Sequence, residues 1–400
     1  MKHSFFNGEN NLIAKFRIQH FWIWNINAVF FNFAIAFFEG KGLDAGVIPY
    51  AMALSVGTGI IGRFIWGYII DKTQALKRTY MLLLLATLLV IWGSALVHSN
   101  FTMFLLMGLL GLVQLPLGSI LDSWILQKFK GREGTYNTIR FFGSIGYTIF
   151  SIIYGIMVDR FGWVVIYICS LGIIGLMEFF TFFTSDISAE QKKALTATVS
   201  KEKLSILPLL KSYRLILISI IGLVTLMACA PFNSFLVRIV EFKGGSVGSI
   251  GLAYALGSIG EIPVFMVYNK VMTKIPPLIR MLLSCGLFFL VFFFSYLAPT
   301  FKLTLISFIF YGMGYAIYLP TLRFCAIEMA PKGLETSAMT FTEAIFAGLS
   351  MILAFVFFGW LIGQYGIQFS LIVTMMILAV VMITLLVWHL ADSKQKKAEK

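Results

Sequence analysis

The chain contains twelve apolar runs, each long enough to cross a membrane as a helix, and short polar breaks separate them. A helix needs about 20 mainly apolar residues to span the hydrocarbon layer of a bilayer. The runs are too long and too evenly apolar for transmembrane strands, which are shorter and alternate in polarity. The sequence therefore predicts an all-α polytopic membrane protein. The expected spans are residues 16–38, 45–70, 79–97, 101–124, 136–158, 163–184, 213–238, 247–269, 278–297, 301–324, 335–358 and 366–390.

Composition agrees with this class and excludes a soluble domain. Of 400 residues, 59% are hydrophobic and 12% are charged, and the mean hydropathy is +0.89. Soluble domains carry about twice that fraction of charged residues. The polar N-terminal segment precedes a full-length apolar run, so we expect no cleaved signal peptide.

The net charge of +13 has an explanation that does not involve nucleic acid. Loops rich in Lys and Arg stay on the cytoplasmic side of a membrane. If both termini are cytoplasmic, most of the basic residues fall on that side, and the outer loops keep Lys41, Arg160, Lys243 and Lys302. We therefore expect a multi-pass protein of a bacterial cytoplasmic membrane, with both termini inside and no nucleic-acid partner.

Cysteine and histidine form no pattern typical of metal binding or covalent catalysis. The four cysteines lie in four different predicted spans, and the four histidines are scattered. Such cysteines are typical of small apolar core residues. The sequence also lacks a nucleophile elbow and a phosphate-binding loop. We expect no metal, no cofactor and no enzymatic activity.

The predicted spans form two sets of six that resemble each other. Residues 62–72 match residues 260–270, and residues 155–162 match residues 359–366, at nearly the same offset. A parallel duplication of this kind is typical of secondary transporters, whose site lies near the membrane midplane. The expected domains are an N-terminal bundle (1–184), a cytoplasmic linker (185–212), a C-terminal bundle (213–390) and a cytoplasmic tail (391–400).

The segment "GYIIDKTQALKR" (67–78) resembles the loop signature of the major facilitator superfamily through Gly67, Asp71, Lys72, Lys77 and Arg78. It lacks the internal glycine of that signature and has one extra residue before the basic pair. The resemblance implies twelve spans in two bundles, and a loop that braces the helices during alternating access. Gly67 is expected to let two helix backbones approach closely, and Asp71 to pair with a base or a helix N-terminus.

The stretch "LDSWILQKFKGREGTYNTIRFFGSIGY" (121–147) places Asp122 and Arg140 at similar depth in two neighbouring predicted spans. An isolated charge at the centre of a span costs about 2.5–3.5 kcal/mol on insertion scales, so we expect the two to pair. The run from Arg140 to Tyr147 resembles the lactose permease, phenylpropionate permease and oligosaccharide–proton symporter branch. That resemblance implies that Asp122 and Arg140 bind solute hydroxyls and that Tyr147 stacks on the solute. A static ion pair is the alternative.

Glu261, in "GSIGEIPVF" (257–265), is the expected proton-coupling residue. A carboxylate beside an arginine stays ionised, whereas one in apolar surroundings is easier to protonate. The resemblance to lactose permease, which has an acid in a comparable part of the eighth span, supports this role. The alternatives are a pair with Arg63 or Arg238, or a simple kink at Pro263.

Arg323 and Glu343 fall close to the positions that Asp122 and Arg140 occupy in the first half, with the charges exchanged. We expect them to pair or to bind substrate or proton together. The tenth predicted span contains no histidine, so the proton pathway of lactose permease does not transfer to this chain.

These features together predict a monomeric transporter that moves a sugar, glycoside, nucleoside or aromatic acid by proton symport, driven by the proton gradient alone. An efflux antiporter of the same fold is the main alternative, although the fifth span lacks the proline typical of drug exporters. A sensor without transport activity or a membrane enzyme is a third class, but no long extramembrane domain or catalytic cluster is visible.

Overall fold

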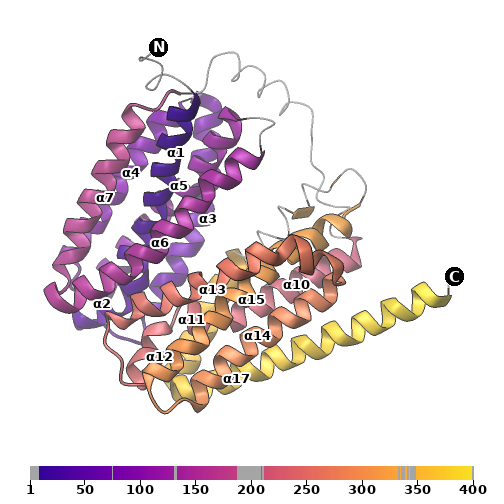
Figure 1. Ribbon diagram of the computed structural model, residues 1–400. Helices are drawn as coiled ribbons and strands as arrows, with labels where there is room; N and C mark the ends of the chain where they lie inside the picture. The colour runs from indigo at the N-terminus through magenta and orange to yellow at the C-terminus, as the bar shows by residue number, and fades with distance from the viewer. Residues whose placement is uncertain are drawn as a thin grey trace. The chain divides into compact units, whose positions relative to one another are not determined.

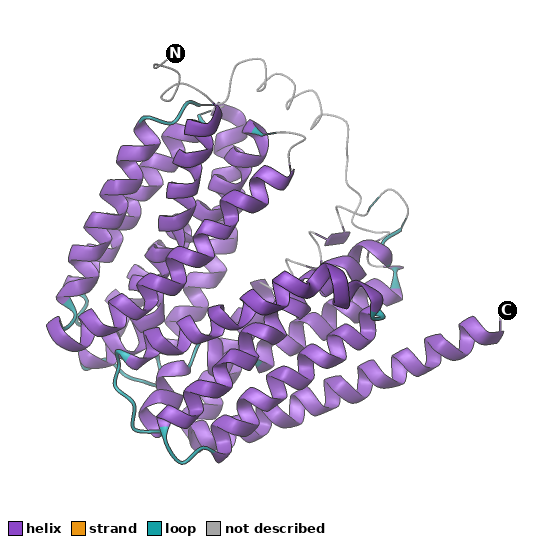
Figure 2. Ribbon diagram, viewed as in Figure 1, coloured by secondary structure: helices purple, strands orange, loops and turns teal. Residues whose placement is uncertain are grey.

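The computed structural model describes residues 9–73, 75–129, 133–186, 209, 211–331, 334, 338–339, 342 and 348–398. All regular structure in this part of the chain is helical, as Figure 2 shows. The chain divides into two compact units, Met1–Lys203 and Leu204–Lys400. The boundary between the units falls inside the segment that the sequence assigns to a linker.

The described part of the first unit contains six apolar spans. The first span combines α1, η1 and α2, and the third combines α4 and the short 3-10 turn η2. Its elements are α1 (Glu9–Val29), η1 (Phe31–Phe33), α2 (Ala34–Gly40), α3 (Ile48–Thr73), α4 (Leu76–Gly93), η2 (Ser94–Leu96), α5 (Asn100–Lys128), α6 (Glu133–Phe161) and α7 (Val164–Phe182).

The second unit repeats this design, starting again with a broken helix. Its elements are α10 (Tyr213–Ala228), α11 (Ala230–Asn233), α12 (Leu236–Phe242), α13 (Ser249–Val271), η3 (Met272–Lys274), α14 (Pro277–Leu297), α15 (Phe301–Glu328) and α17 (Ser350–Ala398). The long α17 consists of two helices, because Gly366 inside it has a φ of 76°.

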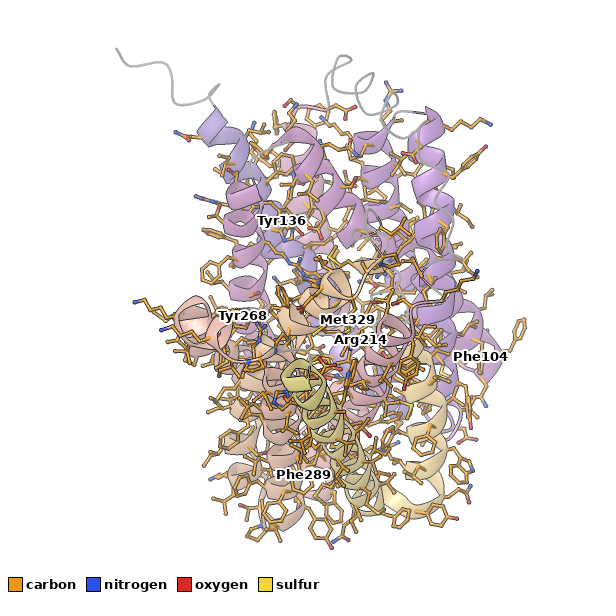
Figure 3. The ribbon with its side chains drawn as sticks, turned by 90° about the vertical axis from the view of Figure 1, so that its right-hand side faces the viewer. Phe104, Tyr136, Arg214, Tyr268, Phe289 and Met329 are labelled. Atoms are coloured by element: carbon orange, nitrogen blue, oxygen red, sulfur yellow. The ribbon has the colours of Figure 1, made fainter. Side chains whose placement is uncertain are left out.

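The predicted fold class is confirmed. Ten helices among the described residues are long and apolar enough to cross a membrane. The shorter apolar helix α10 adds one span, and the two helices of α17 account for two spans rather than one. The end of α17 differs from the prediction, because the helix continues past residue 390 to Ala398. Arg214, which is labelled in Figure 3, forms an ion pair of 3.0 Å with Asp392 on this extension.

The two units pair their spans in the same pattern. In the first unit α3 packs against α5, and α1 lies beside α6 (Figure 1). In the second unit α13 packs against α15, and α10 packs against α17. The second span therefore pairs with the fourth in both units, and the first span of the second unit packs against α17, which contains the fifth and sixth spans. This pattern supports the duplication that the sequence indicates.

Glycines permit the close contact between the second and fourth span of each unit. A Cβ atom on Gly111 of α5 would collide with the carbonyl oxygen of Ser55 in α3. A Cβ atom on Gly312 of α15 would collide with the carbonyl oxygen of Gly257 in α13. Membrane helices have little hydrophobic driving force for association, so close backbone packing at small residues contributes much of their affinity.

The glycines of the matched sequences occupy equivalent structural positions. Gly62 and Gly260 both face the carbonyl groups of the fourth span of their unit. Gly162 and Gly366 both have left-handed backbone, with φ of 68° and 76°. Only glycine adopts this region without strain, so the matches reflect the same backbone requirement in both units.

A pair of lysines repeats in the same way. Lys41 Nζ donates to the carbonyl oxygens of Ala95 and Val97, at 2.8 and 3.2 Å. Lys243 Nζ donates to two carbonyl oxygens at the end of α14, at 3.1 and 2.6 Å. Partial burial lowers the pKa of both lysines. Each lysine therefore satisfies carbonyl groups that the end of the third span leaves without a helical partner.

Replacing Gly312 with Ala should lower the thermal unfolding midpoint, because the added methyl group must push α13 and α15 apart. Overpacking of this kind costs about 1–3 kcal/mol, and more where backbone must move. Gly118→Ala in α5 is the matched control, since a Cβ there would meet no atom within 4 Å. Tryptophan fluorescence during heating measures both variants. Equal midpoints would contradict the proposed packing role of Gly312.

Candidate functional site

The first span breaks between α1 and α2, where η1 replaces the regular helix. A break inside a membrane span is tolerated where other groups satisfy the freed backbone, and it often marks a binding site. Asn32 lies in this break and accepts a hydrogen bond of 3.1 Å from the Tyr147 hydroxyl of α6. The Nδ2 atom of Asn32 is buried and has no partner among the described residues.

Further polar residues of α1 have partners on α5. Asn27 accepts a hydrogen bond of 2.9 Å from Gln114, and His20 is 2.9 Å from Asp122. His20 and Asn27 are seven residues apart and therefore lie on one face of the helix. We call His20, Asn27 and Asn32, together with Asp122, Gln114 and Tyr147, the polar stripe. It runs through a bundle whose other buried side chains are mainly apolar.

The structure corrects the predicted pairing of Asp122. Its side-chain hydrogen-bond partner is His20, with an Nε2–Oδ1 distance of 2.9 Å. Arg140 reaches Asp122 indirectly, because its Nη1 donates to the Tyr136 hydroxyl at 3.2 Å and that hydroxyl also interacts with Asp122. Tyr136, labelled in Figure 3, thus stands between the two charges. The similar depth of Asp122 and Arg140 agrees with this geometry, but the direct contact between them is absent.

The glycines that follow Arg140 bring α6 against α1. A Cβ atom on Gly143 would lie 3.1 Å from the carbonyl oxygen of His20, and one on Gly146 would collide with the carbonyl oxygen of Phe21. Arg140, Gly143 and Tyr147 are spaced along one face of α6. This face of α6 packs against α1 at its glycines and brings the Tyr147 hydroxyl to Asn32.

The broken seventh span carries an equivalent asparagine, which sequence reasoning missed. Asn233, at the end of α11, accepts a hydrogen bond of 2.6 Å from the Tyr311 hydroxyl through its side chain. The backbone carbonyl oxygen of Asn233 accepts a second hydrogen bond, of 2.8 Å, from the Tyr254 hydroxyl. Phe232 stacks on Tyr311 with ring centroids 4.0 Å apart. In both units the break thus contains an asparagine whose side-chain oxygen is held by a tyrosine.

Glu261 lies on α13 next to this group. It interacts electrostatically with Tyr311, and its backbone nitrogen borders the close contact at Gly312. Within the described part of the chain, its carboxylate makes no hydrogen bond or ion pair with another side chain. Arg238, one of the two bases considered as its partner, pairs with Glu241 at 3.1 Å. The apolar setting expected for Glu261 is present within its own unit.

The predicted acid and base pair of the second half is described only in part. Arg323 lies on α15 and is half-buried, whereas Glu343 lies outside the described residues. The sequence analysis did not identify Arg280, another arginine of this unit, as a candidate. Arg280 of α14 is 5% exposed, donates to the Tyr268 hydroxyl at 3.2 Å and lies 5.4 Å from the ring centre of Phe324.

The loop signature at 67–78 differs in part from its expected geometry. Among the described residues, a Cβ atom on Gly67 would meet nothing within 4 Å, so the close approach of backbones that was expected there is found at Gly62 instead. Lys77 Nζ donates to the carbonyl oxygens of Phe182 and Thr184 at the end of α7, at 2.7 and 2.9 Å. Lys77 therefore links α4 to α7. Asp71, Lys72 and Arg78 are exposed.

No group of histidine, cysteine, aspartate or glutamate side chains that could hold a metal ion occurs among the described residues. Each unit instead places hydrogen-bonding side chains at the break in its first span, inside the helix bundle. That arrangement suits reversible binding of a polar solute inside a membrane protein.

Comparison with known proteins identifies the class. Residues 14–353 match the model of the MFS_1 like family, and the chain belongs to this family. The predicted membership in the major facilitator superfamily is confirmed, and the protein is a multi-pass membrane transporter of that fold. This family is a transporter family and not an enzyme class.

Individual relatives are distant. The chain is 22% identical to maltose permease of Geobacillus stearothermophilus over 345 residues, which cover 83% of this chain and 84% of the permease. It is 23% identical to the uncharacterised transporter YwbF of Bacillus subtilis (strain 168) over 308 residues, covering 76% and 74% of the two chains.

Solved structures share the fold at lower sequence identity. The nucleoside transporter NupG superposes with a TM-score of 0.82 at 16% identity, covering 94% of this chain and 98% of NupG. A D-xylose-proton symporter superposes with a TM-score of 0.68 at 12% identity, covering 94% and 96%.

Proposed function

We propose that the protein is a proton symporter that imports a small hydroxylated solute, a sugar, glycoside or nucleoside, by alternating access. The solute-binding residues would be Asp122, Arg140 and Tyr147 in the first unit, and Arg323 and Glu343 in the second. Among the described residues, Asn32 and Asn233 extend this set at the two helix breaks. The proton gradient would be the only driving force.

The observation that carries the proposal is the polar stripe and its unpartnered atoms. The buried atoms Asn32 Nδ2, Gln114 Oε1 and His20 Nδ1 have no hydrogen-bond partner among the described residues. A buried polar atom without a partner costs about 1–3 kcal/mol. A hydroxyl group both donates and accepts, so a solute rich in hydroxyls satisfies such a mixed set better than a carboxylate, which only accepts.

Proton coupling is assigned to Glu261. Apolar surroundings disfavour the charged carboxylate relative to the neutral acid, so an intramembrane carboxyl group without a charged partner binds a proton more readily than one beside an arginine. Its helix borders Tyr311 and hence the Asn233 group. Protonation of Glu261 could therefore influence solute contacts in the same unit. The named substrates of the relatives, maltose, nucleosides and D-xylose with protons, agree with this proposal.

We further propose that the chain lies in a bacterial cytoplasmic membrane as a monomer with both termini cytoplasmic. The segment 67–78 would then form the cytoplasmic gating loop, with Lys77 anchored on the end of α7. Asp71, Lys72 and Arg78 would make contacts that change during alternating access.

Uptake into proteoliposomes tests the function. Purified protein is reconstituted, and accumulation of labelled maltose, uridine and phenylpropionate is measured with and without an imposed gradient, acid outside. We expect accumulation of maltose or uridine above equilibrium only when the gradient is present, and its loss when a protonophore is added. Uptake that is insensitive to the gradient would exclude symport, and uptake of phenylpropionate alone would exclude a hydroxylated substrate.

A further inference from the structure

A buried arginine near the start of the third span of the second unit has no use in the proposed function. Arg280 is the fourth residue of α14 and is 5% exposed. Within the described part of the chain, its guanidinium forms one hydrogen bond, from Nη1 to the Tyr268 hydroxyl at 3.2 Å. Its Nε atom is buried without a partner there, and no carboxylate forms an ion pair with the group. The guanidinium is therefore a buried positive charge with unused donors.

Neighbouring side chains fix the orientation of this guanidinium without offsetting its charge. The Thr321 hydroxyl of α15 donates to the carbonyl oxygen of Ile317 at 2.7 Å, so it accepts the hydrogen bond of 3.2 Å from the Tyr268 hydroxyl. The oxygen of Tyr268, which is labelled in Figure 3, is then left to accept from Arg280. The Phe324 ring centre lies 5.4 Å from the guanidinium carbon. The group is thus held in place by neutral partners only.

The first unit satisfies the base at the start of its own third span. Lys77, the second residue of α4, donates to the carbonyl oxygens of Phe182 and Thr184 at 2.7 and 2.9 Å. The side chain of Arg280 donates to no carbonyl oxygen among the described residues. An arginine has five N–H donors, so most of them remain for a partner from outside the chain.

The surroundings of Arg280 favour an anion as that partner. Residues 268–280 contain three bases and no acid, and the other two bases, Lys270 and Lys274, are exposed. Glu328, at the end of α15, is exposed and forms no ion pair in the part of the chain that the structure describes. Arg280 lies about 4.5 Å along the axis from the first residue of α14, close to the positive end of the helix dipole. This depth is that of lipid headgroups and not of the hydrocarbon centre.

We propose that Arg280 is the centre of a phosphate-binding site at this end of the second unit, filled by the headgroup phosphate of an anionic phospholipid or by free phosphate. The planar fork of a guanidinium matches two oxygens of a phosphate group, and such bonds are about twice as strong as neutral ones. Phe324, which covers the guanidinium, is 48% exposed, so a rotation of this one side chain would open the site. The site does not depend on the solute or on proton coupling.

Native mass spectrometry of the full-length protein tests the site. Protein freed of lipid in detergent is titrated with phosphatidylglycerol and, separately, with phosphatidylcholine, whose choline offsets the phosphate charge. We expect the wild type to bind phosphatidylglycerol on the order of ten-fold more tightly than phosphatidylcholine. Arg280→Gln should lose most of this preference, and Arg280→Lys should keep part of it because it keeps the charge. Arg214→Gln, which removes an exposed arginine from the same unit, is the matched control.

Thermal unfolding of the same samples separates a phosphate site from an arginine that only supports packing. Phosphatidylglycerol or millimolar inorganic phosphate should raise the midpoint of the wild type and of Arg214→Gln, but not that of Arg280→Gln. A response to the lipid alone assigns the site to a headgroup, and a response to inorganic phosphate alone assigns it to free phosphate.

Two results would overturn the site. The first is a wild type that responds to neither additive, and the second is Arg280→Gln with the lipid preference and the midpoint shifts of the wild type. If Arg280→Gln does not fold, Arg280→Met, which keeps an apolar stem beside Phe324, takes its place in both measurements.

Discussion

Arg140→Lys is expected to weaken solute binding roughly 100-fold, consistent with the 2–5 kcal/mol lost when one partner of a buried charged contact is removed. Lysine keeps the positive charge, but it cannot present the planar fork of donors with which arginine contacts two hydroxyls at once. It would also lose the geometry of the 3.2 Å contact to the Tyr136 hydroxyl. Isothermal titration with the solute found in the uptake assay measures the change.

Arg160→Lys provides the matched control for this variant. It makes the same chemical change at an exposed position near the end of α6, so binding should remain as in the wild type. The thermal unfolding midpoint of Arg140→Lys shows whether the fold is retained. If Arg140→Lys binds solute as tightly as the wild type, the arginine serves the architecture of α6 and not the solute.

Glu261→Gln is expected to abolish accumulation against a gradient while leaving exchange of solute across the vesicle membrane. Glutamine resembles the protonated acid in shape and neutrality, so the carrier should reorient with solute but without carrying a proton. The close contact of α13 with Gly312 involves the backbone nitrogen of Glu261 and not its carboxylate, so we expect the fold to persist. Counterflow and gradient-driven uptake are compared in the same vesicles.

Glu328→Gln is the control for the coupling variant, because Glu328 is an exposed carboxylate at the end of α15. It should accumulate solute as the wild type does. If Glu261→Gln still accumulates solute in response to the pH gradient, another group carries the proton.

The spans, their number and the duplication were predictable from sequence because each depends on local properties. An apolar run of sufficient length predicts a membrane span whatever its neighbours are. The matches around Gly62 and Gly162 predicted the repeat, since a close approach or a left-handed turn requires glycine in both copies. The breaks in the first and seventh spans were not predicted. Asn32 and Asn233 are isolated polar residues in apolar surroundings, so hydropathy averaged over a span does not reveal the breaks.

The candidate site was predictable only in part. Asp122, Arg140, Tyr147 and Glu261 stood out because charged or aromatic polar groups are expensive in a membrane span. His20 carried the same signal, a polar residue near the start of an apolar run, but its role depends on Asp122, which lies 102 residues away in the chain. For Gly67 the sequence predicted a close helix contact that the structure does not show, because a Cβ atom there would meet nothing within 4 Å among the described residues.

By itself the sequence determined that this chain is a duplicated, twelve-span helical transporter of the major facilitator type with ionisable groups inside its bundles. Length, hydropathy and repeated glycines are sufficient for the spans and the duplication, since the bilayer acts on each segment separately, whereas the transporter class was implied by the resemblance of residues 67–78 to a family signature. Only the tertiary structure decided that Asp122 pairs with His20, that Tyr136 separates it from Arg140, and that asparagines at two helix breaks are held by tyrosines. Partner choice depends on which helix faces meet and at what register, and side chains at equal depth on neighbouring helices can still face different partners.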